Sequence, residues 1–334
     1  MKIFITGVAG FLGSHLADLM ISEGHTVAGN DNMIGGYTDN VPQNVEFYQV
    51  DCCDLENMTK AMEGCDIVYH TAATAYEGLS VFSPVLVTRN IFEASVTTIT
   101  AAIRNKVKRI VYCSSMARYG HHDKLPYKED YECRPQDPYG IAKKAGEDVL
   151  RNLCDTHGVE YVIAVPHNIV GPRQKYDDPF RNVMSIMLNR MLQGKQPIIY
   201  GDGKQQRCFS YIDDCLYCLN ALAFQDNVVG EVINIGPDEE PITIIKLAEA
   251  CANETGLNLD PIHHKDRPKE VKLAVCSSDK ARDLLGYSTA TNMRQSVKKT
   301  AEYIRTRGTK QFQYHLPLEI INDQTPDTWK KKLI

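Results

Sequence analysis

Short apolar runs alternate with longer amphipathic stretches through the first half of the chain. Six runs are rich in β-branched and aromatic residues and almost continuous in hydrophobicity, at 2–6, 25–31, 45–51, 66–72, 109–115 and 161–167. Such continuity is typical of strands that are covered on both faces. Helical patterns lie between them, the longest at about 84–105 and about 138–157. This alternation predicts an α/β fold built on a doubly wound parallel sheet.

The pattern loosens after residue 167. Short strands, such as "PIIYG" and "EVINIG", are mixed there with helices and with loops rich in Gly, Pro and Asp. We therefore expect a first domain at 1–167 and a smaller α/β lobe at 168–310 that is partly interleaved with it. Residues 311–334 form a C-terminal extension whose role the sequence does not indicate.

Three glycines separate the first expected strand from the first helix. "ITGVAGFLGSHLA" contains Gly7, Gly10 and Gly13, and glycines let a backbone turn tightly and approach a pyrophosphate at a helix N-terminus. Asp31 ends the next strand, 18 residues after Gly13. A carboxylate there can accept hydrogen bonds from an adenosine ribose and would repel a 2′-phosphate. The spacing predicts a Rossmann-type site for NAD rather than NADP; the alternative is a glycine turn that only packs helix on strand.

Asp51 follows the third strand, in "VDCCDLEN". Its carboxylate is placed to face an adenine. The alternative, that it caps the following helix, fits Asp54 better and stays open for Asp51.

A tyrosine and a lysine stand four residues apart near the start of the helix expected at 138–157. This spacing places Tyr139 and Lys143 on one helical face. The pKa of a tyrosine is ordinarily near 10, and a lysine or an oxidised nicotinamide nearby would each lower it by roughly one to two units. Tyr139 would then approach the range of a general base. Ser114 and Ser115 end the preceding strand, where parallel sheets place ligands. A surface Tyr–Lys pair is the alternative.

The chain resembles the NAD-dependent nucleotide-sugar epimerase/dehydratase family, which belongs to the extended short-chain dehydrogenases/reductases. The resemblance runs from residue 1 to about 305. It is carried by the glycine triplet, Tyr139-x-x-x-Lys143 and the segments "YHTAA", "SSMARYG", "PHNIVGPRQ", "YGDGKQQRCFSYIDD" and "HHKDRPKEV".

The resemblance implies a role for each matching residue. Tyr139 would be the base, Lys143 its partner, and Ser115 a hydroxyl beside the substrate. The cofactor would be lined by Gly7, Gly10, Phe11, Leu12, Gly13, Asp31, Asn32, Asp51, Cys52, His70, Thr71, Ala72, Ala73, Asn90, Tyr139, Lys143 and His167. The substrate would be lined by Ser115, Met116, Asn168, Asn182, Val183, Tyr200, Arg207, Arg267, Glu270 and Ala274. Among these, Tyr200 would stack near the nucleotide base, Glu270 would hold its ribose, and the two arginines would grip the diphosphate through forked donors.

The resemblance also narrows the reaction. Members share a first step in which the base removes a sugar hydroxyl proton while hydride passes to NAD⁺. The 4,6-dehydratases carry an Asp-Glu pair after the Ser/Thr, where this chain has Met116 and Ala117. We therefore expect C4 epimerisation of a UDP-hexose. The small Ala274, which aligns beside the sugar C2, adds the hypothesis that a UDP-N-acetylhexosamine fits. The alternatives are a uronate 4-epimerase, a GDP-sugar epimerase, a 4-oxidase or reductase that releases a keto sugar, and a catalytically silent NAD(H)-sensing protein.

Composition excludes some other classes. The net charge is -5 and the pI about 6.1, which argues against nucleic acid as a partner. No apolar run reaches the roughly 18 residues of a membrane span, and we expect a cytoplasmic protein. The 11 cysteines lie mostly in apolar surroundings, and Cys215-x-x-Cys218 has no second pair, so we expect neither disulfides nor a metal site. The resemblance implies a homodimer formed by the helices at about 84–105 and 138–157.

Overall fold

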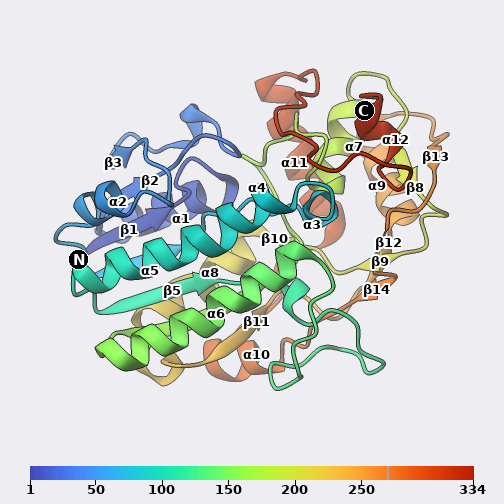
Figure 1. Cartoon of the computed structure of the whole chain (residues 1–334). Helices are drawn as coiled ribbons and strands as arrows, with labels where there is room; N and C mark the ends of the chain where they lie inside the picture. The colour runs from blue at the N-terminus through green and yellow to red at the C-terminus, as the bar shows by residue number, and fades with distance from the viewer. Residues whose placement is uncertain (269–270) are drawn as a thin grey trace.

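The centre of the fold is a seven-stranded parallel sheet, seen in a computed structural model that describes residues 1–268 and 271–334 (Figure 1). Its strands are β1 (Lys2–Thr6), β2 (Thr26–Asn30), β3 (Val45–Tyr48), β4 (Ile67–His70), β5 (Arg109–Cys113), β6 (Glu160–Pro166) and β11 (Val232–Ile235). Their order in space is β11-β6-β5-β4-β1-β2-β3. The order reverses between β1 and β4, and sheets of this kind bind ligands outside the carboxyl ends of the strands at such a point. The expected doubly wound parallel sheet is confirmed.

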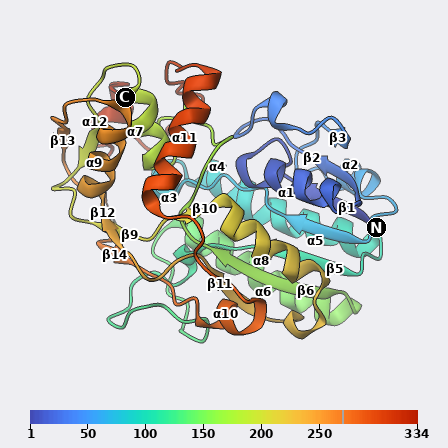
Figure 2. The ribbon, with the colours of Figure 1, turned by 180° about the vertical axis from the view of Figure 1, so that it is seen from behind.

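Helices cover both faces of this sheet. One face carries α1 (Phe11–Ser22), α8 (Ile212–Phe224) and α10 (Asp279–Leu285) (Figure 2), and the other carries α2 (Leu55–Ala61), α5 (Ala94–Arg104) and α6 (Pro138–His157) (Figure 1). Successive side chains of β1 enter opposite layers, Ile3 and Ile5 with α1 and Phe4 with α2. Both faces are therefore buried, which explains the continuous hydrophobicity of the strands.

Helix α6 has clear start and stop signals. Asp137 accepts a hydrogen bond from the Gly140 N–H (2.8 Å), and Pro138 occupies the first helical position. Gly158 ends the helix with a φ of 68°, a left-handed conformation that glycine adopts without steric cost. The helix expected at 138–157 is confirmed, and its first two turns carry Tyr139 and Lys143.

The other long helix is interrupted. The segment at 84–105 consists of α4 (Pro84–Thr88), a π-helical turn η2 (Arg89–Glu93) and α5. The wide turn contains Asn90, whose Nδ2 donates to Thr74 Oγ1 at 3.0 Å. Single π turns often occur beside functional sites. The short helix α3 (Glu77–Ser80) precedes α4. The remaining short turns are η1 (Thr38–Asn40), η3 (Met116–Arg118) and η4 (Asp226–Val228).

The second lobe has its own apolar core between α7 (Val183–Met191), α9 (Ile244–Thr255) and α11 (Met293–Arg307). Its short strands are β7 (Ile169–Val170), β8 (Ile198–Tyr200), β9 (Gln206–Arg207), β10 (Ser210–Tyr211), β12 (Ile242–Thr243), β13 (Ile262–His264) and β14 (Leu273–Ala274). One expectation is wrong: "EVINIG" does not belong to this lobe, because β11 pairs with β6 in the large sheet. Helices α8 and α10 also cover the large sheet, so the chain returns to the first domain after residue 168.

Residues 311–334 run along the open side of the second lobe and end near the short helix α12 (Asp327–Lys330) (Figure 1). Leu316 and Trp329 pack against Tyr76 and Phe82 from the first domain and against Phe180 from the second. None of the helices in the described part of the chain is both long and apolar enough to cross a membrane.

Candidate active site

The loop between β1 and α1 forms one wall of a cavity at the carboxyl edge of the sheet. A Cβ on Gly7, whose φ is 71°, would lie 2.9 Å from the Cα of Ala72. A Cβ on Gly13 would lie 2.2 Å from the carbonyl oxygen of Gly7. Only glycine fits at these two positions. Gly10 precedes α1 and has no side chain to cap it, so the first N–H groups of the helix can meet an anion.

Most of the expected cofactor residues line this cavity. They come from the ends of β1, β2 and β4 and from the segments that follow β3 and α4: Gly7, Gly10, Phe11, Leu12, Gly13, Asp31, Asn32, Asp51, Cys52, Thr71, Ala72, Ala73 and Asn90. His167 lines neither this cavity nor the adjoining cavity that contains Tyr139. Its buried ring bonds through Nε2 to the carbonyl of Pro237 at 3.0 Å. The expected cofactor contact of His167 is therefore not what the structure shows.

Asp31 is held rigidly at the end of β2. Its Oδ2 accepts from the Ala9 N–H at 3.1 Å and its Oδ1 from the Met33 N–H at 2.7 Å. Burial raises the pKa of this carboxyl, and the backbone N–H groups of Met33, Ala9 and Gly10 oppose that rise. A carboxylate oxygen has two lone pairs, so an oxygen that accepts one backbone hydrogen bond can also accept from a ribose hydroxyl.

Asp51 and Asp54 divide the two roles that the sequence left open. Asp54 caps α2 by accepting from the Asn57 N–H at 3.1 Å. Asp51 instead lines the cofactor cavity and accepts from Asn32 Nδ2 at 3.2 Å. Asp54 is the helix cap, and a contact between Asp51 and adenine stays a prediction.

Replacing Asp31 should weaken the discrimination against NADP. We expect Asp31→Ser to lower the ratio of the NADP dissociation constant to the NAD dissociation constant by a factor on the order of 10 to 100. The reason is that a carboxylate placed beside the 2′-phosphate of NADP costs several kcal/mol through repulsion of like charges. Calorimetric titration with both nucleotides measures the ratio. Asp54→Ser removes a carboxylate outside the cavity and should leave it unchanged; an unchanged ratio in Asp31→Ser would contradict the assignment.

His70 lies behind the cofactor cavity and holds neighbouring segments in place through hydrogen bonds. Its Nδ1 is 2.9 Å from Thr6 Oγ1, and its Nε2 is 3.1 Å from Ser95 Oγ. Thr6 Oγ1 also accepts from the N–H groups of Thr71 (3.1 Å) and Ala72 (3.0 Å). The threonine hydroxyl therefore donates to Nδ1, and Nε2 carries the proton. The ring fixes the loop after β4; it is fully buried and does not itself line the cavity, contrary to the expectation for His70.

This buried ring should make the protein sensitive to acid. Burial lowers the pKa of His70 to about 3, below the ordinary value near 6.5. Between these values the unfolded chain binds a proton that the folded chain does not, so the free energy of unfolding falls as the pH falls. From pH 6.5 to 5, His70 should contribute a loss of about 2 kcal/mol.

Urea unfolding at the two pH values measures the loss. His70→Gln should be less stable at neutral pH but lose about 2 kcal/mol less on acidification. His157→Gln, at the exposed end of α6, should behave as the wild type. Equal acid losses in His70→Gln and the wild type would refute the prediction.

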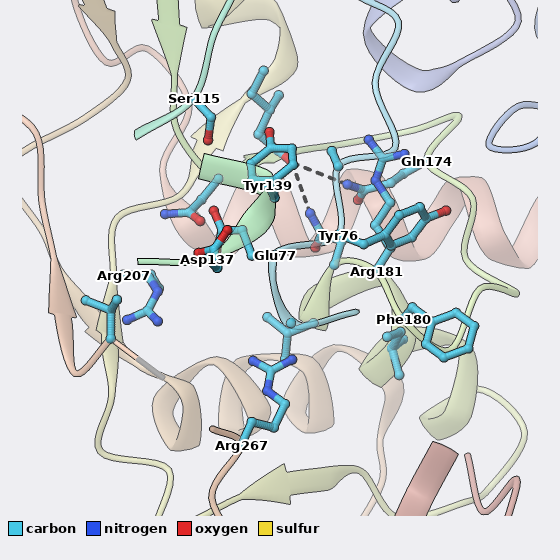
Figure 3. Close-up of a pocket in the computed structure, with 18 of the residues that line it drawn as sticks. Tyr76, Glu77, Ser115, Asp137, Tyr139, Gln174, Phe180, Arg181, Arg207 and Arg267 are labelled. Atoms are coloured by element: carbon cyan, nitrogen blue, oxygen red, sulfur yellow. Dashed lines mark hydrogen bonds between the residues drawn. The ribbon is translucent and has the colours of Figure 1, made fainter. Parts of the chain in front are cut away.

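Ser115, Tyr139 and Lys143 line a second cavity that adjoins the first (Figure 3). Ser115 follows β5, and Tyr139 is the second residue of α6. One turn further on, Lys143 donates from Nζ to the Cys113 carbonyl at 2.7 Å. The two cavities share Phe11, Thr71 and Ala73. A hydroxyl pair therefore lies at the junction between the cofactor side and a space for a second molecule.

The electrostatics of this pair correct one expectation. Burial raises the pKa of Tyr139 above its ordinary value, and the nearby Ser115 hydroxyl only partly offsets the rise. Burial also lowers the pKa of Lys143 to about 8. In the protein without coenzyme, desolvation of the phenol therefore outweighs any lowering of its pKa by Lys143, and the lowering by an oxidised nicotinamide stays a prediction.

Ser114, the serine next to Ser115, has a structural role. Ser114 donates to Glu147, one turn beyond Lys143 on α6, and Arg118 pairs with the same carboxylate at 2.9 Å. All three side chains are buried. Ser114 therefore ties β5 to α6, and Ser115 is the serine that is available for chemistry.

The second cavity extends from Tyr139 to two arginines in the second lobe. Figure 3 shows Ser115 and Tyr139 on one side of the cavity and Arg207 and Arg267 across it. The expected substrate residues that line it are Ser115, Asn168, Asn182, Val183, Tyr200, Arg207 and Arg267. The Arg267 guanidinium lies over the Tyr200 ring, 4.9 Å from its centre, so the aromatic ring and the cation expected at a nucleotide diphosphate are adjacent.

Three expected substrate residues differ. Met116 and Ala274 are buried in the core beneath the cavity and do not line it in the described part of the chain. Val271 lines the cavity near the position expected for Ala274. The argument from Ala274 for an N-acetyl group therefore has no support in the structure. Glu270, expected at the nucleotide ribose, lies outside the described residues.

Other lining residues were not expected. Glu77 and Asp137 face the cavity near Tyr139 (Figure 3), and Tyr76 and Arg181 line both cavities. The Arg181 guanidinium lies 5.6 Å from the centre of the Tyr76 ring. Asp137 could have been found from the Asp-Pro start of α6. The others had no local signal, because Glu77 begins the short helix α3 and Tyr76 and Arg181 lie in loops that only the fold brings together.

Comparison with known proteins agrees with this geometry. A family model described as the NAD dependent epimerase/dehydratase family matches residues 3–236. A putative UDP-glucose 4-epimerase of Methanocaldococcus jannaschii is 30% identical over 91% of this chain and 98% of its own length. The crystal structure of a Thermotoga maritima UDP-glucose 4-epimerase with UDP-glucose is 30% identical, with a TM-score of 0.86 over 92% of this chain and 99% of that one.

A third relative extends the range of sugars. The structure of a Bacillus cereus UDP-glucuronic acid 4-epimerase with UDP-glucuronic acid and NAD is 29% identical, with a TM-score of 0.84, and covers 92% of this chain and 100% of that one. The glycine loop, the Ser115–Tyr139 pair and these matches point the same way. The chain belongs to the NAD-dependent epimerase/dehydratase family, as an NAD-dependent enzyme of the nucleotide-sugar epimerase type.

Proposed function

We propose that this protein interconverts the C4 epimers of a UDP-hexose or UDP-N-acetylhexosamine. The observation that carries the proposal is the cavity that joins Tyr139 and Ser115, beside the cofactor site, to Arg207 and Arg267. Two forked cations suit a diphosphate, and the relatives named above are UDP-sugar 4-epimerases. When bound, NAD supplies an acceptor for hydride from the sugar carbon and a donor that returns it.

The residues of this chain would handle the proton. Tyr139 would remove the proton of the C4 hydroxyl, and Ser115 would hold the same oxygen by a hydrogen bond. Because burial raises the pKa of Tyr139 in the protein alone, the phenolate form needs an added positive charge. An oxidised nicotinamide carries such a charge, so the base would become active only in the loaded enzyme.

The charge of the cavity favours a neutral hexose. Glu77 and Asp137 bring two carboxylates near Tyr139, and Arg181 brings one guanidinium. A uronate would place a third carboxylate in this space, where like charges repel. Met116 and Ala117, at the positions where 4,6-dehydratases carry an Asp-Glu pair, offer no acidic group, whereas Glu77 and Asp137 bring two carboxylates near Tyr139. An assay therefore has to check whether the C6 hydroxyl is lost.

The test is a panel of substrates with the purified enzyme. It contains UDP-glucose, UDP-galactose, both UDP-N-acetylhexosamines, UDP-glucuronate and GDP-mannose. We expect one UDP-hexose or UDP-N-acetylhexosamine pair to equilibrate, by NMR, without a net rise in reduced-nicotinamide absorbance. Stoichiometric reduction would indicate an oxidase, and a 6-deoxy product a dehydratase. Turnover of UDP-glucuronate or GDP-mannose alone would overturn the proposed substrate.

We also propose that the enzyme is a homodimer that pairs α4–α5 with α6. Large apolar side chains are exposed on this face, with Val85 at 70%, Ile141 at 53% and Phe92 at 37% of their surface. Ile141→Glu should convert the dimer to a monomer in sedimentation, since a buried unpaired charge is costly. Ile262→Glu, at a 45% exposed residue of the second lobe, should leave the assembly unchanged; a monomeric wild type would refute the proposal.

A further inference from the structure

The last segment of the sequence, 311–334, lies beyond the residues that carry the family resemblance, yet it reaches the substrate cavity. Trp329 and Ile334 are among the lining residues. Trp329 is 2% exposed. Its ring packs edge-on against Phe180 and Phe82, at centroid distances of 5.3 and 6.0 Å. The segment is thus built into the wall of the cavity.

Hydrogen bonds fix this segment to the first domain. The Glu319 carboxylate accepts from the N–H groups of Val85 (2.8 Å) and Leu86 (2.9 Å), in the first turn of α4. Ser83 Oγ donates to the Pro317 carbonyl at 2.6 Å. The first N–H groups of a helix have no partner within the helix, so the carboxylate both satisfies them and anchors the segment.

Further bonds fix it to the second lobe. The Gln313 N–H donates to the Asp177 carbonyl at 2.8 Å. Asn189 Nδ2, on α7, donates at 2.9 Å to the carbonyl of Lys310, the residue just before the segment. The segment therefore bridges the two sides of the cavity through backbone and side-chain contacts. It is a fixed wall whose position depends on both lobes.

The segment contacts the two residues proposed to bind the nucleotide. Tyr200 Oη and Thr328 Oγ1 are hydrogen-bonded at 2.6 Å. A Cβ on Gly78 would lie 3.3 Å from Arg267 Nη1 and 3.5 Å from the Trp329 ring. The Arg267 guanidinium and the Trp329 indole therefore both lie close to Gly78, and the guanidinium packs over the Tyr200 ring.

We propose that residues 311–334 are part of the nucleotide-sugar site, in which Thr328 and Trp329 position Tyr200 and Arg267 for a nucleoside diphosphate. The inference rests on the proposed function, because it takes Tyr200 and Arg267 as ligands of the nucleotide end. The contacts of Thr328 and Trp329 lie across the cavity from Tyr139. Their loss should therefore weaken binding of the nucleotide and leave proton transfer by Tyr139 unchanged. The segment would thus determine affinity for the nucleotide, while NAD is held by the other cavity.

Two substitutions test this with readouts that separate binding from chemistry. Trp329→Ala and Thr328→Val should each raise the Kd of UDP, measured calorimetrically on the NAD-loaded enzyme, by about 10-fold, or about 1.4 kcal/mol. The KM for the UDP-sugar should rise in parallel, while kcat and the NAD content stay at wild-type values. Asp323→Ala, at an exposed residue of the same segment, is the matched control and should change neither constant.

The outcomes separate the two proposals. If Thr328→Val and Trp329→Ala keep the UDP affinity and KM of an active wild type, or lower kcat alone, the positioning role is overturned and the proposed function stands. If the wild type binds neither UDP nor a UDP-sugar, the proposed function fails first. Should Trp329→Ala not fold, Thr328→Val, which removes one hydroxyl, decides the question alone.

Discussion

Tyr139→Phe is expected to lower kcat by a factor of roughly 10² to 10⁴, the range found for losing a general acid or base. The change removes one oxygen from a ring that is 5% exposed, and the ring keeps its packing. NAD should therefore remain bound, since the cofactor cavity is lined by other residues. Single-turnover measurements of epimer formation, together with the nicotinamide content of the purified protein, check both halves of the prediction.

A matched control separates chemistry from structure. Tyr119 is also buried, and its hydroxyl donates to Asn234 Oδ1 at 2.7 Å. Tyr119→Phe should lose stability, about 1 kcal/mol or more, because a buried acceptor is left unpaired, yet keep kcat. Equal kcat values in Tyr139→Phe and the wild type would reject Tyr139 as the base.

The same residue predicts a spectroscopic result. Because burial raises the pKa of Tyr139, phenolate absorbance from this ring should be absent near neutral pH in the protein freed of coenzyme. It should emerge when oxidised coenzyme is added, and the Tyr139→Phe difference spectrum isolates it. A phenolate signal of equal size without coenzyme would show that Lys143 alone lowers the pKa of Tyr139 enough to ionise it near neutral pH.

Gly13→Ala is expected to abolish tight NAD binding. The added methyl would lie 2.2 Å from the Gly7 carbonyl oxygen and 2.8 Å from its carbon, so α1 and the glycine loop would have to separate. Overpacking of this kind costs typically 1–3 kcal/mol of folding free energy. It also displaces the N–H groups that would meet the pyrophosphate. We expect an NAD dissociation constant at least about 100-fold higher, since 2.8 kcal/mol corresponds to that factor.

Gly10→Ala provides a graded comparison in the same loop. Its Cβ would lie 3.0 Å from the same oxygen, a contact that a small shift relieves. Its effect on the NAD dissociation constant should therefore be clearly smaller. Calorimetric titration and thermal unfolding of both variants check the order, and equal losses would show that crowding against Gly7 is not the cause.

The pKa of a proton-transfer group depends on more than the local motif that identifies it. Tyr139 and Lys143 were identified from their spacing, and the structure brings them to one cavity. In the protein without coenzyme the pKa of Tyr139 is nevertheless raised, because desolvation depends on everything that surrounds the ring. Nothing in a five-residue motif reports that environment.

Features that depend on neighbouring residues could be predicted from the sequence. Continuous apolar runs predicted β1 to β6, a helical pattern at about 138–157 predicted α6, and the glycine spacing located the cofactor loop. Each follows from steric and hydrogen-bonding rules within a few residues.

Which distant segments share a cavity depends on contacts that form only in the folded chain. The fold returns β11 to the large sheet, buries His167 and Ala274 outside the two cavities described, and places Arg181 where it lines both of them. It also brought Trp329 to Arg267. These contacts join segments far apart in the chain, and their energies come from burial and charge in three dimensions, which no local pattern encodes.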